Sequence, residues 1–225
     1  MSARFLATFC LLISSMSIAM AATPSTGIAA ISLRLRSGTV APAAFEELRR
    51  ELVGLMNTAG VAARWEDPTS YRDVNGSTVV VDLEGDCTVP FHREIGPVPD
   101  GSPLASTAAA DNQLLPFVTV NCGSLAALMG PFIADQPEAF REFAFGRALG
   151  RVLAHELYHI VTRSADHLDS GVAKASFSAN DLLKNRFEFD DMAVGRIHAS
   201  EIASSAPEAF DSGAGSGFGN ATEGK

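Results

Sequence analysis

A long helical pattern from Pro137 to about Arg163 constrains this chain more than any other segment. Proline suits the first turn of a helix, and Glu138 lies near the positive end of its dipole. At roughly 100° per residue, two sets of side chains fall on opposite sides. One side carries Phe140, Gly146, Leu149, Leu153, Leu157 and Ile160, and the other carries Ala148, Val152, His155 and His159. The pattern predicts a helix that is buried at its back and offers two histidines at its front.

These two histidines belong to the motif His155-Glu156-Leu157-Tyr158-His159. A spacing of four residues separates the two imidazoles by about 40° around the helix and about 6 Å along it, so both can bind one metal ion. Glu156 lies about 100° further around, where its carboxylate can reach a water on the metal instead of the metal itself. The motif therefore predicts a site for one zinc ion, with Glu156 as the general base.

A catalytic zinc site needs a third protein ligand besides an open position. His167 is the favoured candidate, because a helix that ends near Arg163 lets the chain turn back beneath the metal. Asp166 and Glu188 stay open as alternatives, since carboxylates also bind zinc. His92 and His198 have no partner in the sequence and are interpreted as ordinary surface or core histidines.

The run His155-Glu156-x-x-His159, followed by His167 and then by Gly171-Val172, resembles the metzincin zinc peptidases, especially the matrixin-like ones. The resemblance covers about residues 147–173. It implies a zincin-like fold in which His155, His159 and His167 bind zinc. It also implies hydrolysis of peptide bonds by a zinc-activated water with Glu156 as general base, and hence a peptide or protein substrate.

Three positions depart from the metzincin pattern. The pattern has glycine at the position of Thr162 and the third histidine at the position of Ala165, so His167 comes two residues late. The methionine expected beneath the metal is replaced by Ala173. We therefore expect a longer turn before His167 and the loss of the apolar floor that methionine provides beneath the metal.

The rest of the chain predicts an α+β fold of zincin-like layout. It has a small mixed sheet of about four strands, the long active-site helix and a C-terminal helix. Alternating or β-rich runs predict strands over 31–35, 61–65, 79–83 and 115–120. Apolar spacing predicts helices from Pro42 to Gly60 and from Ser178, which begins a capping-box pattern, to about Ile202. The proline-rich segment from Thr88 to Asn112 is predicted to be a long loop.

The two ends of the chain are expected to lie outside the folded domain. Residues 1–21 combine one early positive charge, an apolar run and Ala19-Met20-Ala21, which is typical of a cleaved signal peptide. Residues 22–203 form the predicted peptidase domain, and the Gly/Ser/Ala-rich residues 204–225 a disordered tail. We expect a secreted or periplasmic protein with no membrane attachment after cleavage.

Signal cleavage leaves Cys87 and Cys122 as an even pair in an oxidising compartment, which predicts a disulfide bond. The alternative, two thiol ligands of a metal, lacks the usual CxxC spacing. The chain has 17 Lys and Arg against 26 Asp and Glu in 225 residues, for a net charge of -9. Such an acidic protein has no bulk attraction for phosphate backbones, so we expect no nucleic-acid partner.

Two other functions remain compatible with the sequence. An exported zinc-binding or peptide-binding module would use the same cleft without hydrolysis. A disulfide-linked secreted domain would hold no metal. Glu156 favours the peptidase, because a structural zinc site needs no carboxylate beside its first ligand. The oligomeric state is not indicated.

Overall fold

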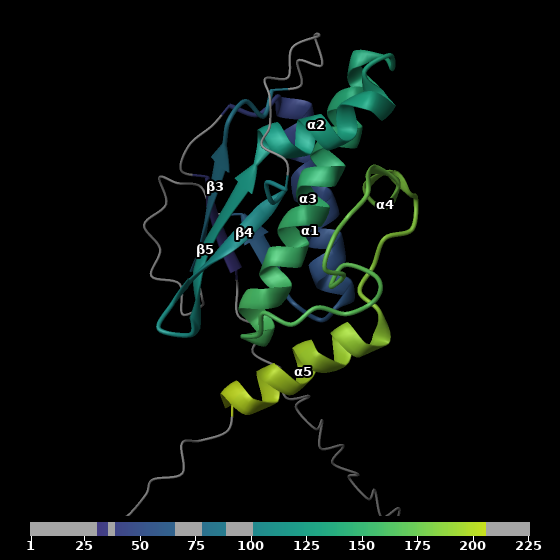
Figure 1. The fold of residues 1–225 in the computed structure, drawn as a ribbon. Coiled ribbons are helices and arrows are strands. Elements are labelled where there is room, and N and C mark those ends of the chain that lie inside the picture. The colour runs from purple at the N-terminus through teal and green to yellow at the C-terminus, as the bar shows by residue number, and fades with distance from the viewer. Residues whose placement is uncertain (1–30, 36–38, 66–77, 89–100, 206–225) are drawn as a thin grey trace, which may run out of the picture.

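The computed structural model describes residues 31–35, 39–65, 78–88 and 101–205 (Figure 1). The order of elements is β1 (Ile31–Leu35), α1 (Pro42–Thr58), β2 (Ala63–Trp65), β3 (Thr78–Glu84), β4 (Ala105–Ala110), β5 (Gln113–Asn121), α2 (Cys122–Ile133), α3 (Glu138–Thr162), α4 (Ala179–Leu183) and α5 (Asp191–Ser205). The predicted α+β class is confirmed. The predicted signal peptide and residues 206–225 of the predicted tail lie outside the described residues, while residues 204 and 205 belong to α5.

The strands form one mixed sheet in the order β2-β1-β3-β5-β4. Neighbouring strands are parallel except β4, which runs antiparallel to β5 at the edge. Alternate residues of the central strands are buried, including Val79, Val81, Val118 and Val120. These side chains form the core together with α1 and α3, which pack on one face of the sheet (Figure 1).

The loop predicted over residues 88–112 is wrong in part, because the edge strand β4 lies within it. Ala105–Ala110 contains only alanine, serine and threonine, so it shows no apolar alternation and has low strand propensity. The strand forms because Asp111 and Asn112 both adopt positive φ, 49° and 62°, in a tight turn that returns the chain onto β5. The sheet therefore has five strands where about four were predicted.

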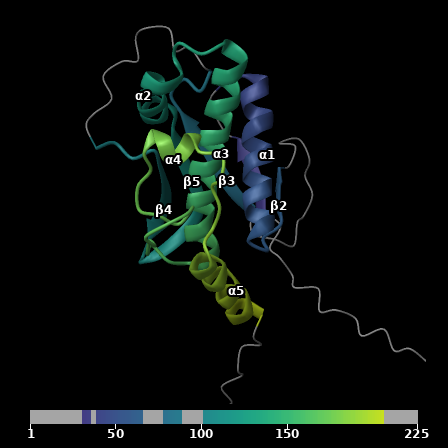
Figure 2. The same ribbon diagram turned by 90° about the vertical axis from the view of Figure 1, so that its right-hand side faces the viewer.

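Helices α1 and α3 approach each other closely through two glycines of α3 (Figure 2). An ideal Cβ on Gly146 would lie 2.2 Å from the carbonyl oxygen of Ala44, and one on Gly150 would lie 2.9 Å from that of Leu48. Both distances are shorter than van der Waals contact. The glycines therefore set the separation of the two helices, and through it the position of α3 over the sheet.

We predict that Gly146→Ala destabilises the protein by about 3 kcal/mol, because the added methyl group forces the helix backbones apart. Gly54→Ala on α1 is the matched control, since nothing lies within 4 Å of its Cβ position. That control should be stabilising by about 0.5–1 kcal/mol, the helix preference of alanine over glycine. Urea unfolding of both variants measures the two free energies. Equal effects would contradict the close approach.

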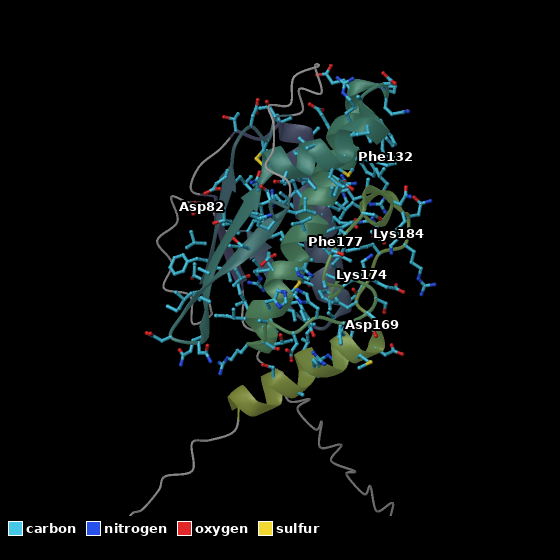
Figure 3. All side chains as sticks on the ribbon, viewed as in Figure 1. Asp82, Phe132, Asp169, Lys174, Phe177 and Lys184 are labelled. Carbon is cyan, nitrogen blue, oxygen red and sulfur yellow. A yellow bond between two sulfur atoms is a disulfide. The ribbon has the colours of Figure 1, made fainter. Side chains whose placement is uncertain are left out.

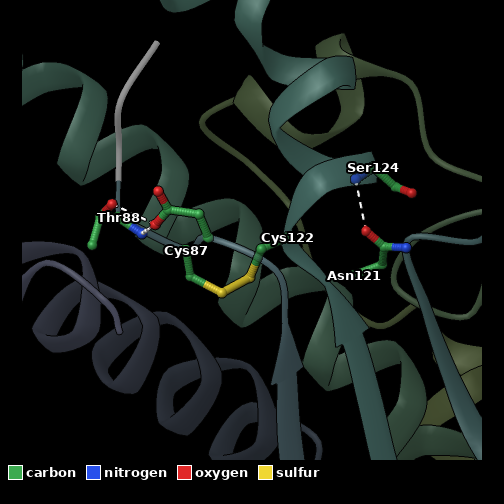
Figure 4. Close-up of a disulfide and its surroundings, with 6 residues drawn as sticks. Cys87, Thr88, Asn121, Cys122 and Ser124 are labelled. Carbon is green, nitrogen blue, oxygen red and sulfur yellow. Dashed lines mark hydrogen bonds between the residues drawn. A yellow bond between two sulfur atoms is a disulfide. The ribbon is translucent and has the colours of Figure 1, made fainter. Parts of the chain in front are cut away.

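A disulfide bond joins Cys87 and Cys122, as predicted (Figure 4). Cys87 follows β3, and Cys122 is the first residue of α2, a helix that the sequence analysis did not predict. The side chain of Asn121 caps this helix by accepting a hydrogen bond from the Ser124 N–H at 2.9 Å. The disulfide bond thus fixes the start of α2 to the residues that follow β3.

The predicted helix from Ser178 to about Ile202 is wrong in its middle. The capping box at its start is confirmed, because Ser178 and Asp181 each bond the other's main-chain N–H. However, α4 ends at Leu183, and α5 begins only at Asp191. Between them Phe187 and Phe189, two residues apart, are both buried, a spacing that suits extended backbone better than a helix. Asp190 then starts α5 by accepting from the Ala193 N–H at 2.8 Å.

The end of α4 is held by Arg151 of α3, which is fully buried. Its Nη1 donates to the main-chain oxygens of Asp181, Leu182 and Lys184 at 2.8–3.2 Å. Its Nε donates to Glu51 of α1 at 2.6 Å. Carbonyls that a helix end leaves without partners are thereby satisfied by one guanidinium.

Asp181 also pairs with Lys174 at 2.6 Å, and this bond lowers the pKa of the Asp181 carboxyl below its ordinary 3.8. A depressed pKa stabilises the folded state above pH 3.8, and that stabilisation is lost as pH falls toward the folded-state pKa. We predict that Asp181→Asn costs about 1 kcal/mol at pH 7 and progressively less below about pH 4. Urea unfolding of the metal-free protein across this pH range tests the trend. A cost independent of pH would contradict it.

Candidate metal centre

Helix α3 carries the two motif histidines, but the expected open front of this helix is wrong. Every residue from Ala148 to His159 is buried. Only 7% of His155 and 6% of His159 is exposed, because β4 and the segment after α3 cover this side. The histidines therefore lie inside the molecule.

Each of these histidines is oriented by a main-chain carbonyl. The Nδ1 of His155 bonds the carbonyl oxygen of Val172 at 2.8 Å, and the Nδ1 of His159 bonds that of Ser164 at 2.7 Å. A carbonyl oxygen can only accept, so both Nδ1 atoms carry the proton. In the neutral rings Nε2 then has a free lone pair, which is the form that binds metals.

The two Nε2 atoms face each other at 3.0 Å. Two lone pairs at this distance repel unless a positive charge lies between them. Burial lowers the pKa of His155 to about 4, so this ring stays neutral at pH 7 and supplies no proton. Two nitrogens on one tetrahedral zinc lie about 3.3 Å apart, close to the observed separation. The donor set thus fits a shared metal ion.

His167 completes a group of three. The nitrogen atoms that His155, His159 and His167 offer lie within 4.8 Å of one another, so the cluster could hold a metal ion. The ring of His167 is exposed and stacks on that of His155, with centroids 5.2 Å apart. The two alternative ligands lie outside the cluster. Asp166 is exposed and 4.0 Å from Arg196, and the Glu188 carboxylate pairs with Arg186 at 2.8 Å.

The turn that brings His167 back begins at Arg163, which adopts the left-handed conformation with φ 52°. The N–H of Arg163 bonds the Ile160 oxygen and that of Ser164 bonds the His159 oxygen, the pattern of a Schellman motif. Ser164 therefore contacts His159 twice, through its N–H and through its carbonyl. This ending accommodates the two-residue displacement of His167 from the metzincin pattern.

The carbonyl that bonds His155 belongs to Val172, and the segment around Val172 is itself held by packing and a hydrogen bond. Val172 is fully buried, and its N–H donates to the Glu188 oxygen at 3.0 Å. Gly171 has φ +66°, and an ideal Cβ there would lie 2.5 Å from the same oxygen. Ala173, at the position where methionine was expected, is also fully buried. Phe177 contributes apolar surface, its ring centroid 5.3 Å from that of His155.

Glu156 is placed beside the cluster by the same helix. Its exposed fraction is 6%, and burial raises the pKa of its carboxyl. A hydrogen bond from the Thr107 hydroxyl to its Oε2, at 2.7 Å, opposes that shift. A carboxylate with a raised pKa is a stronger base and accepts a proton more readily near neutral pH.

His155 and Glu156 open into a common cavity of about 230 Å³. Its other walls come from the approach to β4, from α3 and from the segment before α4: Ser102, Pro103, Leu104, Ala105, Val152, Ala175, Ser176 and Phe177. Figure 3 shows Phe177 and Lys174 beside α3, on the side where this last segment lies. The cavity gives a ligand access to the otherwise buried motif.

Three contributors to this site were not predicted from the sequence: Thr107, Phe177 and the carbonyls of the turn. Thr107 lies in a run of small residues within the supposed loop, so nothing marked it. The carbonyls at Ser164 and Val172 belong to the main chain, which leaves no signal in residue identity. The pattern Asp-Ser-Gly at 169–171 does indicate a turn, but not what the turn supports.

Comparisons with protein-family models, with curated proteins and with solved structures found no match to this chain. The site is therefore interpreted from its own geometry. Among the described residues, none of the helices combines the length and apolar character needed to cross a membrane.

We predict that Gly171→Ala weakens metal binding at least 10-fold, because a side chain at positive φ beside the Glu188 oxygen must displace Val172 and hence His155. Gly85→Ala is the matched control, since Gly85 has φ +83° but only an ordinary contact at 3.6 Å. Titration with zinc in a competing chelator measures both affinities. Equal affinities in the two variants would show that the Val172 carbonyl does not orient the ligand.

Proposed function

We propose that this protein is an exported zinc-dependent peptidase that hydrolyses peptide bonds with Glu156 as general base. The observation that carries the proposal is the common cavity of His155 and Glu156. Ligand nitrogens of three histidines lie within 4.8 Å of one another, and one of these histidines, His155, lines the same cavity as the Glu156 carboxylate. A purely structural metal site would have no use for such a carboxylate.

Zinc is the metal that this donor set favours. Three neutral imidazole ligands with a fourth position left for water or substrate are the arrangement of catalytic zinc sites. Among the described residues, no fourth histidine, cysteine or carboxylate joins the cluster. When bound here, zinc would lower the pKa of its water and polarise the carbonyl group of a substrate.

The protein's own groups would then move the proton. Glu156 accepts it from the attacking water and returns it to the nitrogen of the leaving amine, so the carboxylate is regenerated. Its raised pKa suits both transfers, because the carboxylate is basic enough to accept and the acid strong enough to donate. The protonated Nδ1 atoms of His155 and His159 stay on their carbonyls and keep the rings fixed.

The cavity supports a peptide or protein substrate. Apart from Glu156 and His155 its lining carries no charged side chain, and Leu104, Val152 and Phe177 contribute apolar surface. Such a pocket takes an uncharged side chain beside the bond that is cleaved. The layout of strand, helix and further strands before the motif helix is also the one that the metzincin resemblance implies.

We predict that Glu156→Gln retains about one zinc per chain but cleaves casein at least 100-fold more slowly, since only the proton acceptor is lost. His155→Ala and His167→Ala should lose most of their zinc, because each removes one of three ligands. His198→Ala, an exposed residue of α5, is the control and should match the wild type. Elemental analysis and release of fluorescent fragments from labelled casein measure both properties.

Each result separates the candidate functions. Undiminished cleavage by Glu156→Gln would refute the general base. Zinc bound without any cleavage in the wild type would leave an exported zinc-binding or peptide-binding module. Full zinc in His167→Ala would mean that Asp166 or Glu188 serves as the third ligand. No zinc in any variant would leave a disulfide-linked domain without metal.

A further inference from the structure

Thr107 of the edge strand β4 bonds the carboxylate of Glu156 on α3, and so connects this strand to the motif helix. Its Oγ1 lies 2.7 Å from Glu156 Oε2 and 3.4 Å from the main-chain oxygen of the same residue. Along β4, Thr107 is half-buried while its neighbours Ser106 and Ala108 are exposed. The strand therefore turns one hydroxyl toward α3, and this hydroxyl meets the one carboxylate of the cavity.

Two groups of Thr107 bond the carboxylate of Glu156. The hydroxyl donates to Oε2, and the main-chain N–H of Thr107 also donates to the carboxylate. Because Glu156 lines the cavity, the groups that hold this carboxylate set how it meets a ligand. A hydroxyl donating to a carboxylate is a charge-assisted bond, which is stronger and more directional than one between neutral groups.

Thr107 can hold that carboxylate firmly because it is itself held. Threonine has few χ1 rotamers in a strand, so its hydroxyl has a defined direction. The pairing Thr107↔Val118 fixes its main chain to β5, and Val118 is buried in the core. The glutamate side chain has three torsions, so the direction of its carboxylate depends on the groups that bond it.

We infer that Thr107 is a positioning residue for Glu156, because its hydroxyl holds Oε2 and so fixes the carboxylate at the cavity in the orientation needed to take a proton. The inference rests on the proposed peptidase function and adds to it a residue outside the metal-binding motif. Misplacing a catalytic group by about 1 Å can cost about 100-fold in rate, so one hydrogen bond at this place has a measurable effect.

Thr107→Val keeps the shape of the side chain and removes the hydroxyl, while Thr107→Ser keeps the hydroxyl. Ser106→Ala, which removes the exposed hydroxyl next to it, is the matched control. A peptide spanning the first casein cleavage site serves as substrate. We expect kcat of Thr107→Val to fall about 10- to 100-fold with KM and zinc content unchanged. Thr107→Ser and Ser106→Ala should stay within about 3-fold of the wild type.

A second measurement is independent of cleavage. In urea, Thr107→Val should raise the unfolding equilibrium constant about 10-fold when Glu156 is present, because a bond to a charged group is lost. The same change in a Glu156→Ala background should have an effect of less than about 2-fold, since the partner is already gone. This comparison tests the bond in solution, and it also detects a variant that simply folds poorly.

The outcomes distinguish the inference from the function on which it rests. An active wild type with an equally active Thr107→Val would overturn the role of Thr107 and leave the peptidase intact. An equal loss in Thr107→Ser would also overturn it, because packing would then be the cause. A wild type that cleaves nothing would refute the peptidase and with it any catalytic role of Thr107, even if the unfolding comparison showed the bond.

Discussion

The buried guanidinium of Arg151 is the interaction on which the rest of this structure depends. Arg151 lies on α3 one turn before His155, has no exposed surface and packs over the Phe187 ring at 4.7 Å. It joins three elements at once, because Glu51 belongs to α1 and the carbonyls it binds belong to the end of α4. Burial of a charge is costly unless it is paired and hydrogen-bonded. Glu51 and the carbonyls at the end of α4 provide this compensation, so these partners must be held in place.

From the end of α4, a series of main-chain hydrogen bonds leads to the histidine cluster. The extended residues after α4 present the Glu188 oxygen to Val172, and Val172 presents its own oxygen to His155. On the other side of the cluster, Ser164 holds His159 immediately after the helix ends. The two motif histidines on α3 are thus oriented by segments that follow α3 in the sequence. This arrangement places a rigid helix beneath the imidazoles and short turns around them, which are conditions for a well-organised site.

The sequence predicted those parts whose signal lies in side-chain pattern. The 3.6-residue period predicted α1 and α3, and the even pair of cysteines predicted the disulfide. The spacing of His155 and His159 predicted that their imidazoles would meet. Parts decided by tertiary contacts were not predictable. β4 consists of small residues and exists through its turn and its pairing with β5. The break between α4 and α5 follows from burial of Phe187 and Phe189, which a helical period over 178–202 obscured. Thr107 could not be found without knowing that β4 crosses α3.

The orientation of both motif histidines by main-chain carbonyls has a consequence for how such a site tolerates substitutions and changes of length. Substituting the side chains of Ser164 or Val172 leaves the two accepting oxygens in the chain, so residue identity at these positions is loosely constrained. The number of residues between the two carbonyls, in contrast, is tightly constrained. Adding or removing one residue between Ser164 and Val172 would move an acceptor away from its imidazole, because consecutive Cα atoms are about 3.8 Å apart. In sequences of this kind, the spacing after the second histidine would therefore carry more information about the site than the residues that fill it.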